Sequence, residues 1–372
     1  MEYPLPHNRP TILHCITGLQ PGGAERMLVQ TIPALTEFVH VVMCLQNEGI
    51  VGARLEKIGI QVFYTSPWRA IFALYQIAHE TKPSLMITYL PIADLLGKIF
   101  GKYFSIPIII CSLRSTMRDY RYIPYLILEG LTAKRADHYI AVSNAVKTRF
   151  IKFGIPANTI TVIPNGIPLS EIKSIVRSDT RTFIHKKFGI TPNTFVVGVV
   201  GGLRKERGHA HLLKAFAKAY PKLSRPSCLL IIGDGPELNA LTTKTRQLNL
   251  ENSVHFLGFR NDIIRLLTAC DLVISSSPYE GMSNALLEAM AAGCAIIAMD
   301  IPENRELLTH YVSGFLVRPK SPADLSDAII SLAENPELRA TMGKAAARRS
   351  LAFSIEQTIH NLNKFLKPYI TR

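Results

Sequence analysis

Two glutamates, Glu280 and Glu288, are separated by seven residues directly after the apolar run 271–275. The run is typical of a buried strand and the stretch after Gly281 of a helix, which predicts Glu280 on the connecting loop and Glu288 about two turns into the helix. Backbone N–H groups at such a helix start suit a diphosphate. Because carboxylates repel that anion, we expect the glutamates to bind sugar or ribose hydroxyls. Taken alone, the pair also fits a solvated loop residue and an ordinary surface helix residue.

Three basic residues, Arg204, Lys205 and Arg207, follow a second predicted strand, 195–200, and the pair Gly201-Gly202. Charged donors at the end of a strand in a parallel sheet lie where a nucleotide diphosphate binds. We therefore expect Arg204 and Arg207 to clamp a diphosphate. A solvated basic loop is the alternative.

Two glycine-rich turns follow other predicted strands. Gly22 and Gly23 precede a predicted helix that begins near Ala24, and the small side chains let the backbone approach a ligand closely. The spacing matches neither the dinucleotide fingerprint nor the P-loop, which weakens the NAD and ATP hypotheses. Alone, such a pair more often marks a plain turn. The turn 233–236 either lines a ligand site or merely closes one.

The composition bounds the class of protein. A chain of 372 residues with 48% apolar and 19% charged residues predicts two globular domains. No apolar run approaches the roughly 18 residues that span a bilayer, and residues 1–6 do not resemble a signal peptide, so we expect a cytoplasmic protein. The six cysteines form no Cys-x-x-Cys pair, which favours buried free thiols over disulfides or zinc.

The formal net charge of +14 suggests an anionic partner. Residues 98–152 hold ten Lys and Arg, from Lys98 to Lys152, against three Asp and Glu, a net charge of +7 (10 − 3), with Tyr and Phe interleaved. Basic and aromatic residues together suit an anionic membrane surface or a lipid phosphate. Nucleic acid would fit such a surface too. A solvated face with the aromatic residues in the core is the alternative.

Short apolar runs alternate with helical patterns along the whole chain, which predicts parallel sheets covered by helices, an α/β architecture of two doubly wound, Rossmann-like domains. The polar stretch 170–178 places the boundary near 175, so the expected domains are 1–175 and 176–350, with a helix in 351–372 that returns to the first domain. Ligands are expected in a central cleft between the domains, at the carboxyl ends of the strands. The predicted strands are 11–16, 39–45, 61–64, 84–89, 107–112, 138–143, 159–164, 195–200, 228–232, 254–257, 272–275, 295–298 and 314–317.

In this order the motifs resemble glycosyltransferase family 4, the group 1 glycosyl transferases of the GT-B fold. The resemblance spans nearly the whole chain and is strongest from about 195 to 320. The matching segments are 142–145, 162–167, 200–208, 232–236, 255–259 and the Glu-x7-Glu block that begins at Glu280.

The resemblance implies a role for each matched position. Arg204 and Arg207 would bind the donor diphosphate, with Arg207 standing where a lysine is usual. Glu288 would bind the ribose hydroxyls, and Glu280 the donor sugar. The first domain would serve the acceptor and the second the nucleotide sugar. The implied backbone contacts are Gly258 and Phe259 at the base, Gly281, Met282, Ser283 and Asn284 at the sugar and phosphates, and Gly22 and Gly23 on the acceptor side.

One position departs from the family pattern. Many members carry a histidine after the fifth strand of the first domain, where this chain has Arg114. That arginine could contact a carboxylated sugar or an acceptor phosphate, so the donor sugar stays open. The resemblance implies neither a metal nor another cofactor, and the chain contains no Asp-x-Asp. No nucleic-acid partner is expected.

The hypothesis from the sequence is a retaining glycosyltransferase that uses a UDP- or GDP-sugar. Its acceptor would be a glycan or lipid-linked glycan in cell-surface polysaccharide or lipopolysaccharide biosynthesis, at the inner face of the cell membrane. Two alternatives stay open: a sugar-nucleotide epimerase of GT-B architecture, which would turn over without an acceptor, and a catalytically silent nucleotide-sugar-binding protein.

Overall fold

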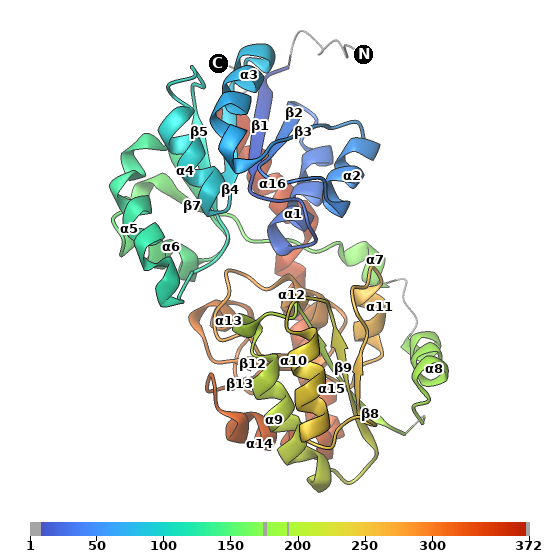
Figure 1. Ribbon diagram of the computed structural model, residues 1–372. Helices are drawn as coiled ribbons and strands as arrows, with labels where there is room; N and C mark the ends of the chain where they lie inside the picture. Colours follow the sequence, from blue (N-terminus) through green and yellow to red (C-terminus); the bar gives the residue numbers. More distant parts are fainter. Residues whose placement is uncertain (1–8, 174–176, 192, 370–372) are drawn as a thin grey trace. The chain divides into compact units, whose positions relative to one another are not determined.

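The computed structural model describes residues 9–173, 177–191 and 193–369, and it divides the chain into two compact units (Figure 1). The first unit runs up to Gly166 and resumes at Ile355, and the second spans Ile167–Ser354. The boundary therefore falls before the expected position near 175, because the short helix α7 (Leu169–Lys173) already belongs to the second unit. Residues 174–176 of the polar stretch, and the N-terminal residues 1–8, lie outside the described parts of the chain.

The first unit is built on a parallel sheet in the order β3-β2-β1-β4-β5-β6-β7. Its strands are continuous apolar runs because helices cover both faces, and all six residues of β1 are buried. Each strand lies within two residues of its predicted bounds, so the predicted strands of this unit are confirmed. The strands are β1 (Thr11–Ile16), β2 (Val39–Cys44), β3 (Gln61–Tyr64), β4 (Leu85–Tyr89), β5 (Ile109–Leu113), β6 (His138–Ala141) and β7 (Ile160–Val162).

The helix α16 (Ile355–Leu366) belongs to the first unit, as the sequence predicts. Leu366 and Tyr369 pack into the core formed by side chains of β1, β4, β5 and β6. The Thr358 hydroxyl donates to the Pro164 carbonyl oxygen at 3.0 Å. The other α-helices of this unit are α1 (Gly23–Thr31), α2 (Ile50–Lys57), α3 (Ala70–Thr81), α4 (Pro91–Phe100), α5 (Ile123–Leu131) and α6 (Asn144–Ile151).

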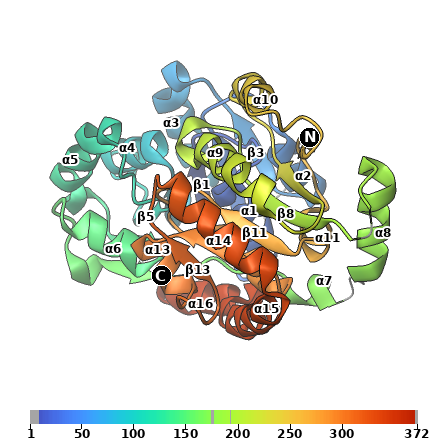
Figure 2. The ribbon, with the colours of Figure 1, turned by 90° about the horizontal axis from the view of Figure 1, so that it is seen from below.

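The second unit holds a parallel sheet in the order β10-β9-β8-β11-β12-β13. Helix α9 packs against α10 and α14, and α12 packs against α11 and α15. Figure 2 shows α9 and α10 on one side of β8 and β11, and α15 on the other. The strands are β8 (Phe195–Val200), β9 (Ser227–Ile232), β10 (Val254–Phe256), β11 (Leu272–Ser275), β12 (Ala295–Met299) and β13 (Phe315–Val317). The helices are α8 (Arg177–Phe188), α9 (His209–Ala219), α10 (Leu238–Gln247), α11 (Ile263–Thr268), α12 (Asn284–Ala291), α13 (Pro302–Leu307), α14 (Pro322–Glu334) and α15 (Pro336–Ser350).

The order of strands reverses once in each sheet, between β1 and β4 and between β8 and β11. At such a point the loops after the two neighbouring strands lead to opposite faces, which leaves room for a ligand at their carboxyl ends. The Gly22-Gly23 pair, the basic segment 204–207 and the Glu-x7-Glu block follow β1, β8 and β11. The fold therefore positions them at the two reversal points.

All six cysteines are free and buried, which confirms the expectation drawn from their spacing. No helix in the described parts of the chain combines the length and the apolar run that crossing a bilayer takes.

Candidate nucleotide-sugar site

The loop after β8 is held against the end of β11 by a close backbone approach at Gly208. Gly208 has φ +75°, and a Cβ atom there would lie 2.2 Å from the Ser276 carbonyl oxygen, so only glycine fits without a shift. The Ser276 hydroxyl donates to the Arg207 carbonyl oxygen at 2.8 Å. Two loops that are far apart in sequence are thereby fixed side by side at the reversal point.

Arg207 and Glu280 form an ion pair between these two loops, through Nη1 and Oε1. The carboxylate of Glu280 raises the pKa of Arg207. The guanidinium has five N–H donors, so the pair leaves donors for a second anion, while the Glu280 carboxylate is held in a fixed orientation. The structure thus brings together two residues that the sequence analysis assigned to different parts of one substrate.

Glu288 is the fifth residue of α12 and is only 1% exposed. The helix begins at Asn284, and the Ser283 hydroxyl caps it by accepting a hydrogen bond from the Leu286 N–H at 3.3 Å. Glu288 therefore lies little more than one turn into the helix, whereas the sequence predicted about two turns. Glu280 is 9% exposed. Both carboxylates are buried, which rules out the surface alternative. A buried carboxylate is costly unless it is paired or hydrogen-bonded, and such groups cluster at functional sites.

The two glycine-rich turns of this unit pack backbone against backbone. Leu203 donates its N–H to the Asp234 carbonyl oxygen at 2.9 Å, and Glu237 donates back to Leu203 at 2.9 Å. A Cβ atom at Gly233 would lie 2.0 Å from the Gly201 carbonyl oxygen. The turn 233–236 therefore packs against the loop that carries Arg204; its lining of a ligand site stays a prediction.

The remaining predicted residues of this unit lie on neighbouring loops. Gly258 follows β10, and its carbonyl oxygen accepts from the Gly233 N–H at 2.9 Å. Phe259 beside it is exposed. Arg204 is also exposed, and its side chain forms no ion pair within the described residues. Contact of these groups with a base or a diphosphate stays a prediction.

His209, the first residue of α9, is a buried residue close to Arg207 that the sequence analysis did not single out. Its side chain is 3% exposed, and within the described parts of the chain neither ring nitrogen has a hydrogen-bond partner. Burial, and then the charge of Arg207, lower the pKa of His209 to about 4, so the imidazole is neutral at pH 7. The sequence signal was its position directly after Gly208 at the helix start.

In the first unit, α1 begins at Gly23, one residue before the expected start, and Gly22 accepts a hydrogen bond from the Arg26 N–H at 3.1 Å. Gly22 is extended, with φ −160°. The pair thus forms the first turn of the helix after β1. Its expected approach to a ligand stays a prediction.

Arg114 follows β5 and donates from Nη2 to the Asn165 Oδ1 at 2.8 Å. The half-buried guanidinium lines a cavity of about 40 Å³, and burial lowers its pKa to about 10. This volume is far below the range of about 300–1,000 Å³ that is usual for small-molecule sites. A substrate contact of Arg114 stays a prediction.

His14 and Tyr89 line the same cavity as Arg114, and together with His40 they form a chain of neutral side chains. His40 Nε2 lies 3.0 Å from the Leu35 carbonyl oxygen, which can only accept, so this nitrogen carries the proton and Nδ1 is an acceptor. His14 Nε2 must then donate to His40 Nδ1 at 3.0 Å, and the Tyr89 hydroxyl donates to His14 Nδ1 at 3.1 Å. Burial lowers the pKa of both histidines. No histidine in this chain was expected to take part in a site.

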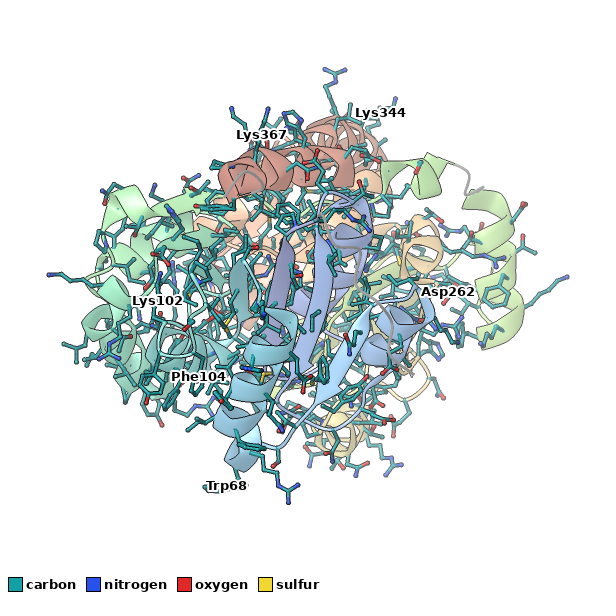
Figure 3. All side chains as sticks on the ribbon, turned by 90° about the horizontal axis from the view of Figure 1, so that it is seen from above. Trp68, Lys102, Phe104, Asp262, Lys344 and Lys367 are labelled. Carbon is teal, nitrogen blue, oxygen red and sulfur yellow. The ribbon has the colours of Figure 1, made fainter. Side chains whose placement is uncertain are left out.

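The basic segment 98–152 is only partly a surface. Lys98 is fully buried and pairs with Glu129 at 2.5 Å, so its assignment to an exposed basic patch is wrong. Lys102, labelled in Figure 3, donates to Asp137 at 3.0 Å. Lys134 and Arg135 are exposed next to α5. That helix turns four large apolar side chains to the surface: Ile123, Ile127, Leu128 and Leu131.

Two doubly wound parallel units, each with its motifs at the reversal of strand order, define the GT-B class. HepE of Anabaena, solved in complex with UDP and glucose, matches with a TM-score of 0.87 and 26% identity, over 97% of this chain and 100% of that chain. The predicted fold class is confirmed.

Family models agree with the fold. The model described as Glycosyltransferase Family 4 matches residues 21–171, and that of the Glycosyl transferases group 1 matches residues 180–349. The chain belongs to this family of glycosyltransferases, as the motifs predict.

Curated relatives are similar over most of the chain. The UDP-Gal:alpha-D-GlcNAc-diphosphoundecaprenol alpha-1,3-galactosyltransferase of Escherichia coli is 27% identical over 279 residues, 73% of this chain and 71% of the relative. The N-acetylgalactosamine-N,N'-diacetylbacillosaminyl-diphospho-undecaprenol 4-alpha-N-acetylgalactosaminyltransferase of Campylobacter jejuni is 24% identical over 382 residues, 94% of this chain and 98% of the relative.

Proposed function

We propose that the protein transfers a sugar from a UDP-sugar, or a GDP-sugar, to a glycan or lipid-linked glycan of cell-surface polysaccharide or lipopolysaccharide biosynthesis, with retention of the anomeric configuration. HepE binds UDP and glucose, which supports a uridine nucleotide sugar. The E. coli and C. jejuni relatives are named for diphosphoundecaprenol acceptors and alpha linkages. An alpha product is what retention gives from an α-linked nucleotide sugar.

The observation that carries the proposal is the Arg207–Glu280 pair between the loops after β8 and β11. In the proposed mechanism, the guanidinium groups of Arg204 and Arg207 neutralise the diphosphate and stabilise it as it leaves the sugar. The backbone N–H groups at the start of α12, over residues 281–284, bind the same anion. These groups supply the positive charge, and we propose that no metal is required.

The two buried carboxylates act on neutral groups. Glu288 accepts hydrogen bonds from the ribose hydroxyls, and Glu280, held by Arg207, orients the donor sugar. A hydroxyl that donates to a carboxylate contributes about 1.5–3 kcal/mol. This corresponds to about a tenfold to hundredfold effect on donor affinity.

The test compares Glu288→Gln with Glu337→Gln, an exposed glutamate in the first turn of α15. Donor affinity, measured from the rise in melting temperature with UDP-sugar, should fall at least tenfold in Glu288→Gln and stay unchanged in Glu337→Gln. Equal affinities in the two variants would contradict the assignment. Conversion of a UDP-sugar to its epimer without acceptor would instead support the epimerase alternative.

A second part of the proposal is attachment to an anionic membrane, as a peripheral cytoplasmic enzyme at the inner face of the cell membrane. The exposed side chains of α5 follow helical spacing at Ile123, Ile127 and Leu131, so they share one face. The exposed Lys134 and Arg135 come directly after them. An apolar face edged by bases suits the boundary between lipid headgroups and acyl chains.

Flotation with vesicles tests the membrane part. Leu131→Ser should weaken binding to vesicles with anionic lipid several-fold. The control variant Leu351→Ser, which replaces an exposed leucine of the second unit, should bind these vesicles as the unmodified protein does. Binding that ignores both the lipid charge and Leu131→Ser would remove the membrane claim and leave the sugar-transfer proposal untouched.

A further inference from the structure

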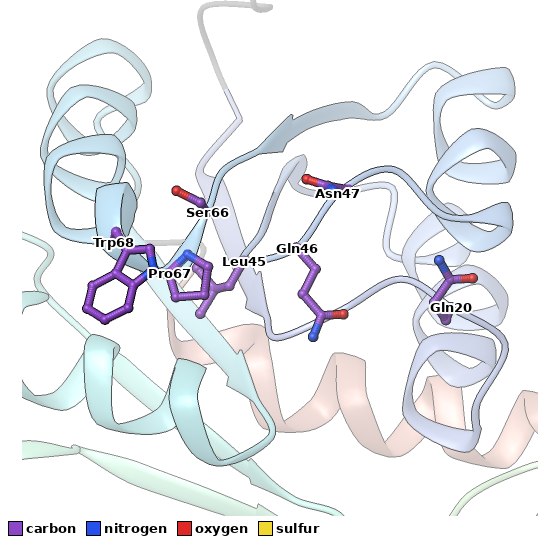
Figure 4. A pocket seen from close by; sticks show the side chains of 7 residues that line it. All are labelled: Gln20, Leu45, Gln46, Asn47, Ser66, Pro67 and Trp68. Carbon is purple, nitrogen blue, oxygen red and sulfur yellow. The ribbon is translucent and has the colours of Figure 1, made fainter. Parts of the chain in front are cut away.

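An open cavity of about 460 Å³ lies in the first unit, at the carboxyl ends of β1, β2 and β3. Figure 4 shows the Trp68 ring and the Gln20 amide on opposite sides, with Gln46 between them. The volume falls within the range of about 300–1,000 Å³ that is usual for small-molecule sites. No role has been given above to the residues that line it: Gln20, Leu45, Gln46, Asn47, Ser66, Pro67 and Trp68.

The lining selects an uncharged, hydroxyl-rich ligand. It contains three carboxamides and one hydroxyl but no charged side chain, so it lacks the cations that a phosphate or a carboxylate needs. Each carboxamide both donates and accepts, which matches the hydroxyl groups around a sugar ring. Trp68 is 96% exposed and offers an aromatic face with negative charge density, against which the C–H face of a pyranose packs.

Backbone contacts hold this lining in place before any ligand binds. Val51 donates its N–H to the Leu19 carbonyl oxygen at 3.1 Å, which joins the loops after β1 and β2. A Cβ atom at Gly18 would lie 2.5 Å from Gln46 Oε1, so the absence of a side chain there makes room for the Gln46 amide. The backbone N–H of Arg69 donates to the Ser66 carbonyl oxygen at 3.0 Å, in the turn that carries Trp68. A preorganised site of this kind loses less entropy on binding.

We propose that this cavity binds a neutral pyranosyl residue of the acceptor glycan, stacked on Trp68 and hydrogen-bonded by Gln46 and Asn47. The inference rests on the proposed function for the identity of the ligand as acceptor. The charged groups assigned to the nucleotide sugar all belong to the second unit, so the uncharged cavity of the first unit is left for a neutral partner.

Trp68 is the only tryptophan of the chain, so its fluorescence reports on this cavity alone. The probes are glucose, galactose, N-acetylglucosamine, N-acetylgalactosamine, their methyl glycosides and neutral disaccharides built from them, with glucuronic acid as the charged comparison. At least one neutral glycan should shift the emission to shorter wavelength in a saturable way, and glucuronic acid should not. No saturable shift with any neutral glycan would overturn the proposal.

Variants then test the hydrogen bonds and the stacking. Gln46→Ala and Asn47→Ala should raise the Kd for the best glycan at least tenfold, whereas Gln61→Ala, an exposed glutamine on β3 outside the lining, should leave it unchanged. Trp68→Ala should raise the acceptor KM at least tenfold. An unchanged glycan Kd in the first two variants, or an unchanged acceptor KM in the third, would refute the assignment.

Two further measurements distinguish a failure of the proposed function, or a membrane anchor, from a failure of the sugar site. UDP should still raise the melting temperature of Trp68→Ala, because UDP binding depends on the second unit. If UDP does not stabilise the unmodified protein, the proposed function is contradicted, but the sugar site in the first unit is not. A Trp68 emission shift with phosphatidylglycerol vesicles and none with glycans would show a membrane anchor instead of a sugar subsite.

Discussion

Gly208→Ala is the change whose effect can be worked out most fully from the structure. An alanine at φ +75° costs about 1–2 kcal/mol in backbone strain. Its Cβ atom would lie 2.2 Å from the Ser276 carbonyl oxygen, whereas ordinary contact begins at 3.4 Å, so the end of β11 must retreat by about 1.2 Å. Overpacking of this kind costs about 1–3 kcal/mol, and loss of the Ser276–Arg207 hydrogen bond about 0.5–1.5 kcal/mol.

The expected loss of unfolding free energy is therefore about 2.5–6.5 kcal/mol, together with a loss of nucleotide binding because the Arg207–Glu280 pair spans the displaced loops. Gly293→Ala is the matched control: φ there is +70°, but nothing lies within 4 Å of the added Cβ. It carries the same strain and the same change in the unfolded chain, and should cost only about 1–2 kcal/mol.

The assay is scanning calorimetry of both variants with and without UDP, because the transition that UDP raises is that of the nucleotide-binding unit. The two variants should differ in that transition, and only Gly293→Ala should keep the UDP effect. Equal destabilisation, with UDP binding retained in both, would refute the argument that the close approach at Gly208 builds the site.

The remaining predictions concern buried ionisable groups. Lys98→Met should lower the free energy of unfolding in urea by about 3–5 kcal/mol, because it leaves the Glu129 carboxylate buried without its lysine partner. The double variant with Glu129→Met should recover most of this loss. An unchanged urea midpoint in Lys98→Met would contradict the buried pair. The pKa of His209 is about 4 in the folded state against 6.5 for the free side chain, so the unfolded chain takes up a proton first as the pH falls. The contribution of His209 to the free energy of unfolding should therefore be full above pH 6.5 and fall by up to about 3 kcal/mol between pH 6.5 and 4. His209→Gln should flatten this fall, and the exposed His360→Gln should not; equal slopes in the two variants would show that His209 is not the group responsible.

The sheets could be predicted from the sequence, because each buried parallel strand is a short apolar run bounded by turn residues. The contact between Arg207 and Glu280 could not. The two residues are 73 positions apart, and only the strand order, which places β11 beside β8, brings their loops together. Local patterns fix which segments are strands but not their neighbours in the sheet.

Lys98 was misplaced because a count of charges ignores which face of a helix a residue occupies. It lies one turn after Asp94 on α4, and both side chains are buried. The Thr88 and Tyr125 hydroxyls donate to Asp94 at 2.6 and 3.1 Å, and burial and the neighbouring Glu129 raise the pKa of Asp94 to about 8. A buried polar cluster of this kind follows from the approach of α5 to α4, which the sequence pattern did not predict.

The distribution of charge supports different roles for the two units. In the second unit, cationic side chains and buried carboxylates gather at the reversal of strand order, which suits a ligand with a diphosphate and hydroxyl groups. In the first unit, a buried chain of neutral side chains runs from Tyr89 at the end of β4 through His14 to His40, and the larger cavity has an uncharged lining. The uncharged lining of that cavity supplies no ion pair to offset the lost hydration of a diphosphate. Desolvation alone therefore favours the nucleotide sugar on the second unit and a neutral acceptor sugar on the first.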